Sequence, residues 1–229
     1  MFYSMLVLFH VATAVVGLLS GTLSMLARKG SGWHAAAGNI FVVSMLGMSS
    51  SAVYLAAVYH PIMINVVAGT LTFYLVTTSW QAAKYRDGRA TAFHSAALLF
   101  VLAVALSSFS FGFTVAGQYG IPGAVYFVFG TVALLCAASD LRVLRQGGVS
   151  GPARLSRHLR MPLAFFVAVM SLYPGRAGLF PKWLRETKLL FVPHLLLIGA
   201  MLFWLVRLSK RKRMQRRTTE AVQTAPLAA

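Results

Sequence analysis

Histidine is the residue type in this chain whose positions could do chemistry. Five of the six histidines lie inside long apolar segments or at their mouths. An ionisable side chain at membrane depth indicates a functional site, and imidazole is the commonest metal ligand and a frequent axial ligand of haem iron. These five candidate ligands are His10, His34, His94, His158 and His194.

The five histidines form two predicted layers. His10 and His194 each lie about two turns inside the first and last apolar segments, roughly 10 Å below the outer boundary at a rise of about 1.5 Å per residue. His34, His94 and His158 follow basic loops at or near the start of alternate segments. A bundle that gathers these alternate helices would bring the three inner histidines together. Two would suffice for a bis-histidine haem, and three would suit zinc.

The elements that position them are predicted to be transmembrane helices. The chain of 229 residues is 58% hydrophobic and 11% charged, and its apolar runs match the thickness of a bilayer. We therefore expect an all-α polytopic membrane protein, a bundle of about seven helices. Residues 1–209 form a single transmembrane domain, and 210–229 form a basic, disordered cytoplasmic tail. The expected spans are 2–26, 33–59, 62–83, 91–115, 121–141, about 152–173, and 188–208.

The sixth span depends on where its helix begins. Its purely apolar part, 161–173, is short, so the helix must start near Pro152, a residue tolerated in a first turn. Arg154 and Arg157 would then extend toward the lipid headgroups.

Lysine and arginine predict the orientation and the partners. They concentrate after the first, third and fifth spans and in the tail, which favours an outside N-terminus and a cytoplasmic C-terminus in a bacterial inner membrane. This distribution explains the net charge of +17 as a topology signal. We therefore expect the lipid bilayer as a partner and no nucleic acid. The oligomeric state does not follow from the sequence.

The sequence lacks the residues that several kinds of reaction usually require. The four acidic residues are Asp87, Asp140, Glu186 and Glu220, and none is expected at mid-membrane, where ion pumps place a carboxylate. No HExxH, GxSxG or P-loop motif occurs, so no reaction is assigned. The single cysteine, Cys136, is interpreted as a packing residue.

Two short patterns concern packing. Gly17 and Gly21 form a GxxxG step, which favours close helix contact. A weak repeat consists of a basic loop, an aromatic residue and a histidine, and it occurs at Trp33-His34 and again at Phe93-His94.

At His10, at His34 with Gly38, and at His94, the chain resembles an uncharacterised bacterial family of predicted multi-pass membrane proteins. Ala35 and Ser95 stand where that family favours arginine. The resemblance covers about the first half of the chain, and its layout is similar to that of transmembrane b-type cytochromes. The resemblance implies haem b held by histidine pairs near the two membrane faces. The absence of the two arginines puts haem-propionate contacts at those positions in doubt.

Three functional hypotheses follow. The first is a haem b electron carrier with a redox partner. In it His10 and His194 bind an outer iron and His34 and His94 bind an inner one, with His158 as an alternate ligand or a partner of a haem propionate. The second is a non-redox membrane protein, either a small-solute carrier or a structural or regulatory partner. The third is a metal-dependent membrane enzyme that uses the inner histidines.

Overall fold

The computed structural model describes residues 2–85, 88–118, 122–148 and 151–171. The predicted seventh span, His194 and the tail 210–229 lie outside the described residues. The described elements are α1 (Phe2–Leu26), α2 (Gly32–Tyr54) with a π-helical turn η1 (Leu55–Tyr59), α3 (Met63–Lys84), α4 (Ala92–Thr114), α5 (Gly123–Arg145), α6 (Gly151–His158) and α7 (Arg160–Ser171).

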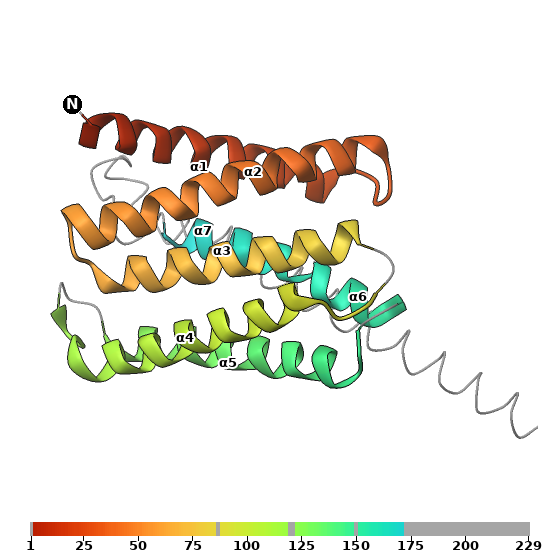
Figure 1. Cartoon of the computed structure of the whole chain (residues 1–229). Helices are drawn as coiled ribbons and strands as arrows, with labels where there is room; N and C mark the ends of the chain where they lie inside the picture. The colour runs from red at the N-terminus through yellow and green to blue at the C-terminus, as the bar shows by residue number, and fades with distance from the viewer. Residues whose placement is uncertain (1, 86–87, 119–121, 149–150, 172–229) are drawn as a thin grey trace, which may run out of the picture.

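The helices α1 to α5 run back and forth along a common direction (Figure 1). Helix α3 lies between α2 and α4 and also contacts α5, α6 and α7. The connections after α1, α3 and α5 lie at one end of the bundle (Figure 1). We call this the basic end, because Arg28, Lys29, Arg89 and Arg145 lie at or beside these connections.

Four described helices are long and apolar enough to cross a membrane: α1, α2 with η1, α4 and α5. The chain is therefore an all-α, multi-pass membrane protein, but the expectation of seven such spans was wrong for the described residues. The helices expected at 62–83 and 152–173 do not meet the requirement, and the one expected at 188–208 lies beyond the described part.

Helix α3 is less apolar than the four candidate spans because it is the central helix of the bundle. Its buried side chains include Thr72, Tyr74, Thr78 and Ser79. A helix covered by other helices does not need an apolar surface toward lipid and can use polar side chains for contacts between helices. Its 22 residues are long enough, at about 1.5 Å each, to match a bilayer.

The expected sixth helix is broken into α6 and α7 at Leu159. Pro162 explains the break, because proline has no N–H and its ring clashes with the carbonyl four residues earlier, that of His158. The Ser79 hydroxyl of α3 donates to the carbonyls of Arg157 (3.0 Å) and His158 (3.2 Å). A side chain from the central helix therefore satisfies backbone groups that the break leaves without helical partners.

The GxxxG step of α1 packs as predicted. Gly17 and Gly21 are buried, and α1 lies against α2. A Cβ atom on Gly21 would lie 2.7 Å from a ring carbon of Phe41 and 2.8 Å from one of Phe165. The absence of a side chain at Gly21 thus allows α1 to approach both α2 and α7.

We predict that Gly21→Ala destabilises the protein by about 1–3 kcal/mol, the usual cost of overpacking. The buried Cys136 is the single cysteine, so its reaction with a thiol-reactive fluorophore during heating reports unfolding. Gly32→Ala is the matched control, because nothing lies within 4 Å of its added Cβ. Equal melting temperatures for the two variants would contradict the packing argument.

Candidate functional site

His34 and His94 occupy the same position in their helices, which explains the repeated sequence pattern. Each is the third residue after an N-cap, Ser31 for α2 and Thr91 for α4, and each follows an aromatic residue. The cap side chain accepts a hydrogen bond from the histidine backbone N–H in both helices. The repeat is therefore a helix-capping pattern, and it does not by itself indicate two equivalent ligands.

The imidazole of His94 completes its cap. Its Nδ1 accepts a hydrogen bond from the Thr91 backbone N–H at 3.1 Å, so the two residues form a reciprocal capping box. The side chain is buried, at 2% exposure. This hydrogen bond uses one ring nitrogen of His94 within its own helix.

The imidazole of His34 instead crosses to α1. Its Nδ1 lies 2.8 Å from the carbonyl oxygen of Ser24 and 3.2 Å from the Ser24 hydroxyl. A carbonyl only accepts, so Nδ1 carries the proton in this contact and Nε2 of the neutral ring carries the lone pair. Metal-binding histidines are commonly held in this way. Lys29 donates to the same carbonyl at 3.2 Å, and partial burial lowers the pKa of its amine.

His34 lies beside His158. Their ring centroids are 6.5 Å apart and the ring planes meet at 83°. His158 is the last residue of α6, not near the start of an unbroken helix as expected. Its Nδ1 is buried and has no hydrogen-bond partner among the described residues.

The structure does not gather all three inner histidines. His94 begins α4, which α3 separates from α2 (Figure 1). Among the described residues there is no group of three or more His, Cys, Asp or Glu side chains placed to hold a metal ion. The predicted trio therefore divides into the His34–His158 pair and a separate His94.

His10 of the predicted outer layer contacts α2. Its Nδ1 lies 3.1 Å from both the Met48 carbonyl oxygen and the Ser51 hydroxyl. The Ser51 hydroxyl donates its own proton to carbonyls of α2, so Nδ1 of His10 is the donor in these contacts. Its predicted partner, His194, lies outside the described residues. His60 forms part of the α2–α3 turn, as expected, and its Nε2 lies 3.2 Å from the Tyr3 hydroxyl.

A buried polar cluster was missed by the sequence reasoning. We call Tyr74, Thr78, Asp140, Arg157 and Arg160 the Asp140 cluster. Asp140 is fully buried, and its carboxylate lies 2.8 Å from Arg160 Nη2 and 2.9 Å from Arg157 Nη1. Tyr74 donates to the same carboxylate at 2.6 Å. The expectation that Arg157 reaches the headgroups was wrong, because its side chain is 3% exposed.

The two arginines of the cluster differ in their hydrogen bonds. Arg160 donates to Asp140, Tyr74, Thr78 and the Cys136 carbonyl. Arg157 forms an ion pair with Asp140 without hydrogen-bond geometry, and its Nε, Nη1 and Nη2 have no hydrogen-bond partner among the described residues. Two guanidinium groups therefore share one carboxylate, and one of them is incompletely satisfied.

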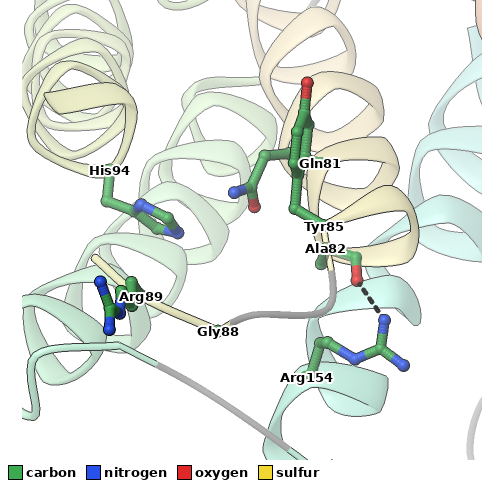
Figure 2. A pocket seen from close by; sticks show the side chains of 7 residues that line it. All are labelled: Gln81, Ala82, Tyr85, Gly88, Arg89, His94 and Arg154. Carbon is green, nitrogen blue, oxygen red and sulfur yellow. Dashed lines mark hydrogen bonds between the residues drawn. The ribbon is translucent and has the colours of Figure 1, made fainter. Parts of the chain in front are cut away.

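A small pocket lies at the basic end, lined by residues of α3, α4 and α6 and of the α3–α4 connection (Figure 2). Its volume is about 10 Å³, about the size needed for one water molecule. Arg154 of α6 donates a hydrogen bond to the Ala82 carbonyl of α3 at 3.1 Å. His94 lines the pocket. The remaining lining residues are Gln81, Tyr85, Gly88 and Arg89.

Two sequence signals could have revealed the cluster. Pro162 could have predicted the helix break, which makes headgroup contact of the adjacent arginines a weaker expectation. Asp140 lies in an otherwise apolar segment, and a carboxylate there requires a buried partner. The pairing itself joins residues far apart in the chain.

No protein-family model, curated protein or solved structure matches the chain. The family resemblance considered above therefore stays a prediction.

We predict that Asp140→Asn destabilises the protein by about 3–5 kcal/mol, because two buried guanidinium groups lose their counter-charge. Tyr74→Phe is the matched variant. It removes the hydrogen bond that Tyr74 donates to the same carboxylate and the one that its hydroxyl accepts from Arg160, and should cost about 2 kcal/mol. Thermal unfolding followed through Cys136 labelling measures both. If Asp140→Asn lost no more stability than Tyr74→Phe, the charge pairing would contribute little to the stability of the fold.

Proposed function

We propose that this integral membrane protein binds haem b, with His34 and His158 as the ligands of the iron near the basic end. The observation that carries the proposal is the proximity of these two imidazoles, whose ring centroids lie 6.5 Å apart. At such a separation one metal atom can fit between two rings, each at the usual nitrogen–metal distance of about 2 Å.

The chemistry of the two rings supports the proposal. The contact with the Ser24 carbonyl directs the proton of His34 to Nδ1 and keeps the lone pair on Nε2. His158 has a buried Nδ1 without a hydrogen-bond partner among the described residues. A buried, unsatisfied ring nitrogen is costly, and a bond to iron would satisfy it.

His158 replaces His94 in this proposal. The Nδ1 atom of His94 is used by its capping box, and α3 stands between its helix and α2. His10 is kept as a ligand of the outer iron, because its Nδ1 donates to α2 as that of His34 donates to α1. His194 is kept as the partner expected from the sequence.

The proposed cofactor would supply reversible one-electron transfer. We propose a bacterial inner-membrane location with the basic end in the cytoplasm, so that two irons near opposite faces would carry electrons across the bilayer to a redox partner. The protein would hold the ring nitrogens in place and limit the access of water.

The test is a reduced-minus-oxidised absorbance spectrum of the full chain, purified in mild detergent after expression with haem available. We expect b-type bands. His34→Ala and His158→Ala should each lower the haem content by about half, because each pair would hold one of two irons. His60→Ala is the matched control, since His60 belongs to a turn and contacts Tyr3.

Other outcomes would select the alternatives. Absence of b-type bands would overturn haem binding. Stoichiometric zinc, copper or non-haem iron in elemental analysis would then favour the metal-dependent enzyme, and absence of both metal and haem would favour a non-redox membrane protein. Equal haem content in His34→Ala and His60→Ala would remove the assigned pair.

A further inference from the structure

The Asp140 cluster carries more positive than negative charge. Arg157 and Arg160 contribute two guanidinium groups, and Asp140 is the single described carboxylate within reach of either. Arginine stays charged in proteins, and Tyr74 contributes no negative charge while it donates its proton to Asp140. A net buried charge is strongly unfavourable unless a counter-ion compensates it.

Arg157 is the less satisfied of the two arginines. Arg160 has four hydrogen-bond acceptors around its guanidinium, whereas Arg157 makes an ion pair with Asp140 and its three nitrogens have no hydrogen-bond partner among the described residues. Its side chain is 3% exposed, so bulk water does not replace the missing acceptors. An acceptor that also carries negative charge would satisfy both needs.

The pocket at the basic end is lined in part by positive side chains. Arg89 and Arg154 line the same pocket (Figure 2). Positive side chains beside a pocket raise the local concentration of anions at the basic end.

We propose that the Asp140 cluster binds a small inorganic anion of the chloride class at Arg157. The anion would complete the charge balance of the cluster and accept hydrogen bonds from the Arg157 guanidinium. The site is separate from the His34–His158 pair and does not depend on haem.

The experiment compares the thermal stability of the purified full chain in sodium chloride and in sodium gluconate at equal ionic strength. Chloride should raise the melting temperature saturably, by about 3–6 °C at ten times the dissociation constant. Arg157→Gln should abolish the difference between the salts. Arg142→Gln, a control at an exposed arginine of α5, should keep it.

The outcomes distinguish the proposal from its competitors. Equal stability of the wild type in both salts, or an equal chloride response in Arg157→Gln, would overturn it. Should Arg157→Gln fail to fold, Arg157→Lys keeps the charge but alters the donor geometry, and an unchanged apparent chloride affinity would overturn the assignment to Arg157. If Glu186 supplied the compensating negative charge instead, the wild type would show no chloride response and Glu186→Gln would show one.

Discussion

The ion-paired contact of Asp140 with Arg160 and Arg157 is the constraint on which this bundle depends. It joins α5 to α6 and α7, and Tyr74 attaches the same carboxylate to the central α3. Removing one charge from such a group leaves the others uncompensated in a low-dielectric interior. The contribution of each member to stability therefore depends on the others. The cluster therefore fixes where the broken helix α6–α7 lies against α3, and hence where His158 lies relative to His34.

The break in that helix is what separates the two candidate sites. Arg157 and His158 are adjacent in the chain, yet one contacts α5 and the other lies beside the histidine of α2. Pro162 ends α6 at this point, and Ser79 satisfies the carbonyls of both residues. One short, capped helix end thus serves an ionic site on one side and an imidazole pair on the other.

Local features were predictable from the sequence, and long-range pairing was not. The bounds of α1, α2, α4 and α5, the close packing at Gly21 and the turn at His60 follow from hydrophobic runs, small residues and proline. The division of the inner histidines depends on α3 standing between α2 and α4, an order in space that periodicity does not encode. Arg157 was misjudged because arginine near a helix end usually faces headgroups. In this fold the carboxylate of Asp140, on the preceding helix α5, holds it inside.

The polarity of α3 has a consequence for how the chain enters a membrane. Insertion of a helix into lipid is driven by its own apolar side chains, and α3 does not join the four helices that are apolar enough. It must therefore enter the bilayer together with a more apolar neighbour, α2 or α4, as half of a helical hairpin. Tyr74 and Ser79 acquire their partners only when α5 and α6 have followed, so biogenesis of the central helix is completed by segments that are synthesised after it.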